Sequence, residues 1–326
     1  MISLEHISIG YHNHRALLSG INLTAGQGEL VALVGRNGSG KSTLLRSLLG
    51  LIPLLEGDCL ISGTSINHMN PLSRARSLSY VSSQVSGLPS LTVRELVSLG
   101  RMPHTGWLGK MSSLDKEVVQ NTLEEIGLAS YADQNLDQLS DGERQRVMIA
   151  RALVQDTPHM VLDEPAAYLD IPNKYELVRL LSLFRDRGKT IVYSTHDLET
   201  ALMSADKFWV ITGNKVHEGS PEDLGMAGIF RDLYHHAGIS FDLNAGRFVF
   251  ARPARGRVSL SGDHGEGLGW TRHALERIGY QVMEEKQPLD IRFSHGKPNT
   301  WIIKHKESEI FADSLLHMAR ILTQEL

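Results

Sequence analysis

The sequence of 326 residues predicts an α/β protein in which helices flank a mostly parallel sheet. Two observations support this fold class. Continuous apolar runs, typical of buried parallel strands, occur at 30–34, 160–162 and 190–194. A helical pattern precedes each of the last two runs, at 143–154 and 174–184, so strands and helices alternate along the chain.

Two further layers are expected around this sheet. Segments 2–9 and 59–61 are predicted to be strands of an additional antiparallel β layer. The chain then turns helical over about 91–140, which predicts a separate helical lobe. Thr92 is placed to cap the first helix of this lobe, and a second helix is predicted at 114–126.

A second domain is predicted after a change in composition near 252–256. We therefore expect a first domain at 1–253 and a small C-terminal α+β domain at 254–326. A domain of this size is marginally stable alone. Its pattern predicts a strand, a helix, three strands and a helix, at 257–260, 270–278, 280–283, 290–293, 301–304 and 309–322.

The composition indicates an ordinary globular protein, with 41% hydrophobic and 21% charged residues. The formal net charge of -4 gives no overall basic surface, so nucleic acid is not an expected partner. The single cysteine, Cys59, fits a reducing compartment. No signal-peptide pattern opens the chain, and the most apolar segment, 44–55, is too interrupted to cross a bilayer, so any membrane crossing would need another chain.

Residues 35–43 carry the first chemical motif. They match the phosphate-binding pattern G-x-x-x-x-G-K-[ST], between a predicted strand and a predicted helix. The glycines let backbone amides wrap phosphate groups, Lys41 neutralises the phosphate charge, and Ser42 supplies a hydroxyl to Mg²⁺. The predicted nucleotide-binding residues of this Walker A loop are Gly35, Arg36, Asn37, Gly38, Ser39, Gly40, Lys41, Ser42 and Thr43.

An apolar strand that ends in two carboxylates forms the second motif, at 160–164, in the Walker B arrangement. Asp163 is predicted to hold Mg²⁺ through its water shell. Glu164 is predicted to polarise the attacking water as the general base. The structural alternative is a strand end followed by a solvated turn.

Residues 139–146, LSDGERQR, nearly match the LSGGQ-type signature that separates ATP-binding-cassette (ABC) ATPases from other phosphate-loop proteins. Ser140, Asp141 and Gly142 lead into a helical pattern, as an anion site at a helix N-terminus requires. The alternative is a purely structural capping box, which Glu143 would complete with Ser140. Asp141 replaces the usual glycine and Glu143 the common glutamine. We expect the Asp141 side chain to point away from phosphate and to cap the helix.

In this order the motifs resemble the ABC transporter ATPase family over 1–253. The resemblance implies that Tyr11 stacks on adenine, and that Gln84 touches Mg²⁺ and faces a membrane subunit. It also implies that Asp170 belongs to the D-loop and that His196 contacts the γ-phosphate. The resemblance thus assigns catalysis to Lys41, Gln84, Glu164 and His196, and the metal to Ser42, Gln84 and Asp163. Besides the Walker A loop, the residues assigned to the nucleotide are Tyr11, Gln84, Ser140, Asp141, Gly142, Glu143, Asp163, Asp170 and His196.

The same resemblance implies the partners of the chain. The signature of one copy would close on an ATP held by a second copy, so a head-to-tail homodimer with ATP and Mg²⁺ is expected. Two transmembrane permease subunits would bind this dimer at the cytoplasmic face of the inner membrane. A substrate-binding protein would act through those permease subunits.

A narrower resemblance concerns segment 99–106, LGRMPHTG, with Asp115 downstream. This segment is similar to the helical-lobe segment of ATPases that serve iron-siderophore, heme and vitamin B12 importers, as are 196–201 and 233–249. The resemblance implies import of an iron chelate, heme or cobalamin. An exporter ATPase, a soluble non-transport ABC ATPase and an ATP-dependent regulatory module are the alternatives.

Overall fold

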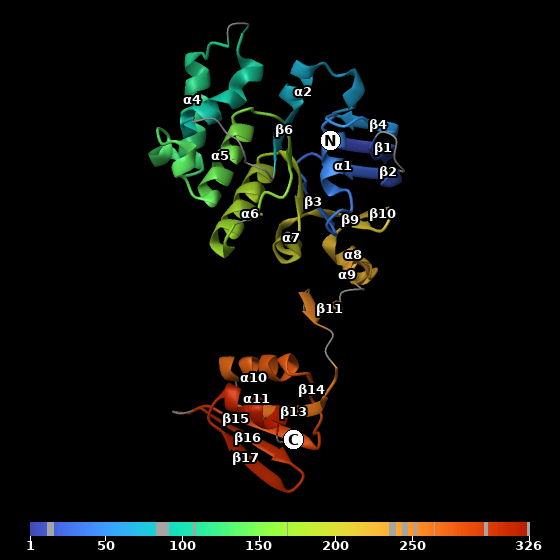
Figure 1. Cartoon of the computed structure of the whole chain (residues 1–326), viewed down its shortest axis with the longest axis vertical. Helices are drawn as coiled ribbons and strands as arrows, with labels where there is room; N and C mark the ends of the chain where they lie inside the picture. Colours follow the sequence, from blue (N-terminus) through green and yellow to red (C-terminus); the bar gives the residue numbers. More distant parts are fainter. Residues whose placement is uncertain are drawn as a thin grey trace. The chain divides into compact units, whose positions relative to one another are not determined.

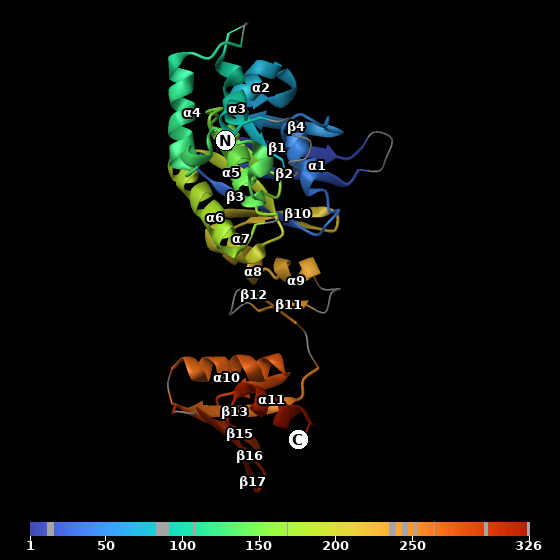
Figure 2. The same cartoon turned by 60° about the vertical axis from the view of Figure 1, so that its left-hand side comes forward.

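Two compact units make up the chain in its computed structural model, Met1–Val249 and Phe250–Leu326 (Figures 1 and 2). The structure describes residues 1–11, 16–82, 91–106, 109–167, 169–234, 239–242, 247–250, 253–263, 265–296 and 299–324. Within these residues, no helix is both long enough and apolar enough to span a membrane.

A six-stranded sheet forms the centre of the first unit. Its strands are β3 (Leu30–Gly35), β6 (Leu78–Val81), β7 (His159–Leu162), β8 (Thr190–Thr195), β9 (Lys207–Thr212) and β10 (Lys215–Gly219). In the order β10-β9-β3-β8-β7-β6, the neighbours pair in parallel except β10, which runs antiparallel to β9. The apolar runs predicted as buried strands form β3, β7 and β8, which are buried along their whole length. The α/β fold class is confirmed.

Helices cover both faces of this sheet (Figure 1). They are α1 (Lys41–Leu48), α5 (Asp141–Leu153), α6 (Ile171–Asp186) and α7 (Leu198–Ser204). Side chains of a strand alternate between faces, so β3 contributes to two cores. Leu30 and Val34 join the core that contains α5, α6 and α7, whereas Val31 and Leu33 join the core that contains α1. The loops at the carboxyl ends of the strands are thereby held between two packed layers.

A four-stranded antiparallel sheet completes the core on the α1 side, as predicted. Its strands are β1 (Ile2–Ile9), β2 (Leu18–Ala25), β4 (Glu56–Ile61) and β5 (Thr64–Ser65), in the order β2-β1-β4-β5. Ile7 and Ile9 of β1 and Leu18 of β2 pack in the same apolar core as Leu44 of α1. The antiparallel sheet therefore covers the helix that follows the Walker A loop.

The helical lobe contains α3 (Val93–Ser98), a 3₁₀ segment η2 (Leu99–His104), α4 (Ser113–Glu125), and the short turns η3 (Ala129–Tyr131) and η4 (Leu136–Gln138). The predicted cap is confirmed: the Thr92 side chain accepts from the amide of Glu95, and Glu95 returns the bond in a capping box. The lobe leads directly into α5 (Figure 2). Residues of α3, α4 and α5 share one apolar core.

The remaining elements of the first unit lie at its edges. They are η1 (Ile66–His68), α2 (Pro71–Ser77), α8 (Pro221–Met226), α9 (Ile229–Tyr234), β11 (Ile239–Asp242) and β12 (Arg247–Phe250). β11 and β12 pair with each other. Phe241 of β11 packs against Phe230 of α9, with ring centroids 5.1 Å apart, so this pair of strands is tied to the first core.

The second unit is a small α+β domain, as predicted. It contains β13 (Gly256–Gly262), α10 (Glu266–Arg277), β14 (Tyr280–Met283), β15 (Leu289–Ser294), β16 (Thr300–His305), β17 (Ser308–Ala312) and α11 (Leu315–Gln324). Its strand order is β14-β13-β15-β16-β17. The helix predicted from 309 is wrong at its start, because Ser308–Ala312 pairs antiparallel with β16 as an edge strand and α11 begins at Leu315.

His159, at the start of β7, gives a stability prediction. Its side chain is buried, and Nε2 lies 3.0 Å from Oγ of Ser62. Burial, together with the nearby N-terminal amine, lowers the pKa of His159 to about 4. In the unfolded chain the histidine has a pKa near 6.5, so it binds a proton at a pH where the folded protein keeps it neutral. The free energy of unfolding therefore falls by about 3 kcal/mol as the pH falls from about 6.5 to 4.

A His159→Gln variant is expected to lose this pH dependence. Urea unfolding between pH 7 and pH 4 measures it, as the slope of the free energy of unfolding against pH. His68, which is exposed, supplies the matched control His68→Gln, which should keep the wild-type slope. A wild-type slope in both variants would contradict the prediction.

Candidate nucleotide site

A cavity of about 510 Å³ opens at the carboxyl ends of β3, β7 and β8. The predicted motifs, far apart in the sequence, meet there because parallel strands end at the same edge of a sheet. The cavity is lined by Tyr11, Leu17, Asn37, Gly38, Gly40, Lys41, Ser42, Thr43, Glu164 and His196.

The Walker A loop joins β3 to α1. Gly38 and Gly40 adopt positive φ angles of 76° and 102°, which only glycine takes without strain, and Gly40 is the N-cap of α1. Nζ of Lys41 is buried and donates to the carbonyl oxygens of Gly35 (2.9 Å) and Arg36 (3.3 Å). The loop therefore curls around its own lysine, and its amides are left to face an anion.

Burial lowers the pKa of Lys41, while the carboxylates of Glu164 and Asp163 act to raise it. Nζ of Lys41 lies 3.9 Å from Oε1 of Glu164. A cation held by loop carbonyl oxygens and close to two carboxylates is positioned to compensate phosphate charge.

Asp163 is buried and bonds to Ser42, which lines the cavity. Its Oδ1 accepts hydrogen bonds from Oγ of Ser42 (3.1 Å) and from Oγ of Ser194 (2.7 Å). A carboxylate and a hydroxyl beside a phosphate loop form the all-oxygen donor set that Mg²⁺ prefers, with phosphates and waters completing the shell. The predicted pair Ser42 and Asp163 is thus brought together, and it fits the metal.

Glu164 and His196 form a second pair at the cavity wall. Oε1 of Glu164 lies 2.6 Å from Nε2 of His196. The backbone of Glu164 has a φ angle of 51°, an uncommon value for a residue with a side chain. Its amide donates to Oγ of Ser194 (2.8 Å). The carboxylate is therefore held at the cavity by both its side chain and its backbone.

Ser194 is the residue that the sequence prediction omitted. One hydroxyl accepts from the amide of Glu164 and donates to Asp163, so it fixes both carboxylates of the Walker B strand. Ser194 is the next-to-last residue of the buried strand β8, two residues before His196. A serine that follows the apolar centre of this strand, close to the predicted His196, was the available signal.

Tyr11 and Gln84 are the two predicted residues outside the main loops. Tyr11 is half exposed at the cavity, and its hydroxyl lies 3.1 Å from Oγ1 of Thr43. Its stacking on adenine stays a prediction. Gln84 lies outside the described residues.

The signature residues Ser140 and Glu143 form a capping box at the start of α5. The Ser140 side chain caps the helix, accepting from the amide of Glu143. The Glu143 carboxylate accepts in return from the amide (2.8 Å) and hydroxyl (2.7 Å) of Ser140, and these bonds, with one from Tyr131, lower the pKa of Glu143. The capping alternative is therefore confirmed by the structure. The anion site at the same helix end stays a prediction.

Asp141 points outward, as expected, but it does not cap the helix. Its side chain is exposed, with Oδ1 3.6 Å from Nη1 of Arg144. Ser140 takes the cap because it is the residue just before the first helical turn, whereas Asp141 is already helical.

None of the described residues that line the cavity comes from the signature. Gly142 instead faces the start of α6, where an added Cβ would lie 3.2 Å from Nδ2 of Asn173. Asp170 caps α6 by accepting from the amide of Asn173, 3.1 Å away, and from Nδ2, 2.6 Å away. The predicted signature and D-loop residues thus lie together, apart from the phosphate loop of their own chain.

Comparison with known proteins agrees with this geometry. The family model described as "ABC transporter" matches residues 18–167, and the model described as "Iron ABC transporter C-terminal domain" matches residues 255–323. The petrobactin import ATP-binding protein FpuC of Bacillus anthracis is 35% identical over 76% of this chain and 90% of its own length. The iron(3+)-hydroxamate import ATP-binding protein FhuC of Bacillus subtilis is 33% identical over 72% and 87%.

Solved structures share the fold of the first unit. A dimeric bacterial ABC transporter cassette, MJ0796, superposes with a TM-score of 0.61 and 28% identity, over 68% of this chain and 98% of that one. A post-hydrolysis state of the same cassette was solved with ADP and Pi. The fold and the cavity define an ABC-type ATPase. The chain belongs to the ATP-binding proteins of ABC transporters, and it hydrolyses ATP.

Proposed function

We propose that this chain powers the import of a ferric siderophore or a related chelate, such as heme or cobalamin. The relatives FpuC and FhuC are named for petrobactin and iron(3+)-hydroxamate import, and a cobalamin import protein of Halobacterium salinarum is 36% identical over 75% of this chain. The match of residues 255–323 to an iron ABC transporter domain supports the same cargo class. We assign residues 1–253 to the cassette and 254–326 to the accessory domain.

In the proposed mechanism, the Walker A amides and Lys41 bind the β- and γ-phosphates of ATP. Glu164 accepts a proton from the attacking water, and His196 holds the Glu164 carboxylate in place and contacts the γ-phosphate. Ser42 and Asp163, with Gln84, would hold Mg²⁺, which supplies charge neutralisation on the phosphates. The observation that supports this assignment best is the 2.6 Å contact between Glu164 and His196 inside the cavity.

The signature is proposed to serve the ATP of a second copy. Ser140, Asp141, Gly142 and Glu143 are absent from the described lining of their own cavity, yet a cassette of the same fold is a dimer. A head-to-tail dimer places the signature of one subunit over the phosphate loop of the other. Asp170 would lie at the same interface, because it neighbours the signature.

The dimer is proposed to bind two permease subunits at the cytoplasmic face of the inner membrane, with a substrate-binding protein acting through them. A transporter of the same cassette fold, assigned to the metal-chelate type, has been solved in an inward-facing conformation, with 26% identity and a TM-score of 0.64 over 72% of this chain and 88% of that one. ATP binding shifts such a transporter between states because it favours the closed cassette dimer.

Uptake by cells that lack this chain tests the cargo. Labelled iron supplied as a hydroxamate or a catecholate siderophore, labelled heme and labelled cobalamin are compared in the deleted strain, with the wild-type chain and with Glu164→Gln restored. We expect one uptake to be lost and to return with the wild-type chain alone. Undiminished uptake of every cargo would refute the import proposal, and raised retention of a compound would favour an exporter.

A further inference from the structure

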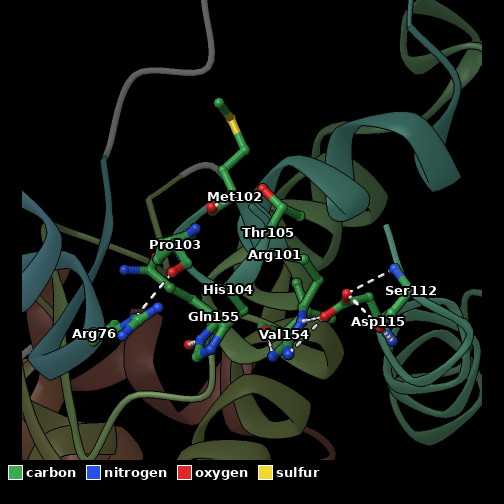
Figure 3. Close-up of polar contacts among 10 residues, drawn as sticks. All are labelled: Arg76, Arg101, Met102, Pro103, His104, Thr105, Ser112, Asp115, Val154 and Gln155. Carbon is green, nitrogen blue, oxygen red and sulfur yellow. Dashed lines mark hydrogen bonds and ion pairs between the residues drawn. The ribbon is translucent and has the colours of Figure 1, made fainter. Parts of the chain in front are cut away.

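The 3₁₀ segment η2 presses against the last turn of α5, the helix that the signature begins (Figure 3). A Cβ added to Gly100 would lie 2.1 Å from the carbonyl oxygen of Arg151 and 2.6 Å from Cγ2 of Val154. A side chain at position 100 would therefore clash with the backbone of α5, so glycine lets η2 pack closely against this helix. Gly106, two residues after η2, has open space around it.

Arg101 bonds to the end of α5 from this position. Its side chain is buried, and Nη1 donates to the carbonyl oxygen of Val154 (2.7 Å). Val154 is the C-cap of α5, so its carbonyl has no acceptor role inside the helix. The guanidinium thus satisfies a helix end that would otherwise be buried without a partner.

The same guanidinium bonds to the start of α4. Nε and Nη2 of Arg101 donate to Oδ1 of Asp115, at 2.9 and 2.8 Å, and Asp115 is buried as well. The other carboxylate oxygen of Asp115 accepts from the amide and hydroxyl of Ser112 at the start of α4. Hydrogen bonds from Ser112, together with Arg101, lower the pKa of Asp115 to about 2. One side chain therefore joins the first turn of α4 to the last turn of α5.

Two neighbouring contacts reinforce this junction (Figure 3). Nε2 of His104 lies 2.8 Å from the carbonyl oxygen of Gln155, so this nitrogen carries the proton. Nε of Arg76 donates to the carbonyl oxygen of Pro103 (3.0 Å). The segment is consequently tied to the C-cap of α5 by Arg101, to the residue after that cap by His104, and to α2 by Arg76.

We infer that Arg101 is a positioning residue for the signature, holding α5 so that Ser140, at the opposite end of that helix, meets the ATP of the second subunit. The inference rests on the proposed function, in which the signature serves that ATP. α5 has 13 residues and spans about 20 Å, so fixing one end of a rigid helix sets the place of the other. A buried ion pair adds little net stability compared with apolar packing, which favours a geometric role.

Arg101→Lys tests the inference, because a lysine cannot reproduce the fork that reaches Asp115 and Val154 together. ATP binding by the monomer should stay at the wild-type Kd, since the variant leaves the phosphate loop intact. ATP-driven dimerisation and turnover should fall about tenfold, the loss expected for one charge-assisted hydrogen bond. Arg94→Lys is the matched control: Arg94 also pairs with a carboxylate of the lobe, Asp133, and should keep wild-type turnover.

A double-mutant cycle with Ser140→Ala separates positioning from simple stabilisation. If Arg101 acts through the signature, Arg101→Lys should cost much less turnover in the Ser140→Ala background than in the wild type. Equal losses in both backgrounds, or a Kd of the monomer that rises in parallel with the loss of turnover, would overturn the inference. Full turnover in Ser140→Ala and Ser140→Arg would instead overturn the proposed shared site.

His104→Phe provides a second variant, should Arg101→Lys fail to fold. It removes the bond to Gln155, just after the C-cap of α5, and leaves the buried ion pair in place. A smaller loss of dimerisation, again with unchanged ATP binding by the monomer, is expected. Asp115→Asn weakens the same junction from the side of α4. Wild-type dimerisation of His104→Phe, together with additive losses of turnover in Asp115→Asn and Ser140→Ala, would count against the inference.

Discussion

Replacement of Glu164 by glutamine is expected to lower ATP turnover by about 10²–10⁴-fold, because an amide cannot accept the proton of the attacking water. The Glu164 carboxylate faces the cavity and lies against Nε2 of His196. Glutamine has nearly the same shape, and the Walker A loop is unchanged, so ATP binding should persist. Single-turnover hydrolysis and the Kd for ATP, measured on one preparation, check both parts.

The matched control is Glu199→Gln, an equal loss of charge at an exposed position in the first turn of α7. It should turn over ATP at the wild-type rate. Comparable turnover in Glu164→Gln and Glu199→Gln would remove Glu164 from the role of general base. Loss of ATP binding in Glu164→Gln would show that the carboxylate holds the phosphate loop in place instead.

Mixing two inactive variants is expected to restore hydrolysis. Lys41→Ala disables the phosphate loop and leaves the signature intact, whereas Ser140→Arg blocks the signature and leaves the phosphate loop intact. In a head-to-tail heterodimer, the loop of the second variant meets the signature of the first, and one complete site forms. Turnover in an equal mixture should reach about a quarter of the wild-type value, since half the dimers are mixed and each has one complete site.

Each variant measured alone provides the control, and both should show turnover near background. Ser140→Arg should still bind ATP, because its own cavity contains no described signature residue. If each site lay within one chain, mixing would restore nothing. Absence of recovery, with dimers demonstrated by light scattering, would therefore refute the shared site.

The central strands of the first unit could be predicted because each is marked by its own stretch of sequence. The strands β3, β7 and β8 are buried on both faces, so each is a continuous apolar run. β17 was missed for the opposite reason: as a short edge strand its residues 308–311 are exposed or half-buried, and its place depends on pairing with β16. Long-range pairing leaves little trace in the sequence of an edge strand.

The site residues likewise fall into those that lie in a contiguous motif and those that only the packing brings together. The Walker A loop is one contiguous pattern, so nine residues could be named from the sequence. Ser194 could not, because it meets Asp163 and Glu164 through the adjacency of β7 and β8. Segment 99–106 and Asp115 were singled out by resemblance alone. The direct contact of Arg101 with Asp115, and its bond to the end of α5, depend on the packing of the lobe.

The left-handed backbone of Glu164 has a thermodynamic consequence. A φ angle of 51° at a residue with a side chain costs of order 1–3 kcal/mol, and the fold tolerates it only because its neighbours enforce it. A glycine at this position would relax the chain and leave the enzyme without its proposed base. A substitution that raises the stability of the fold at this position would therefore remove the proposed base. At Glu164, stability and ATP turnover make opposite demands on the same residue.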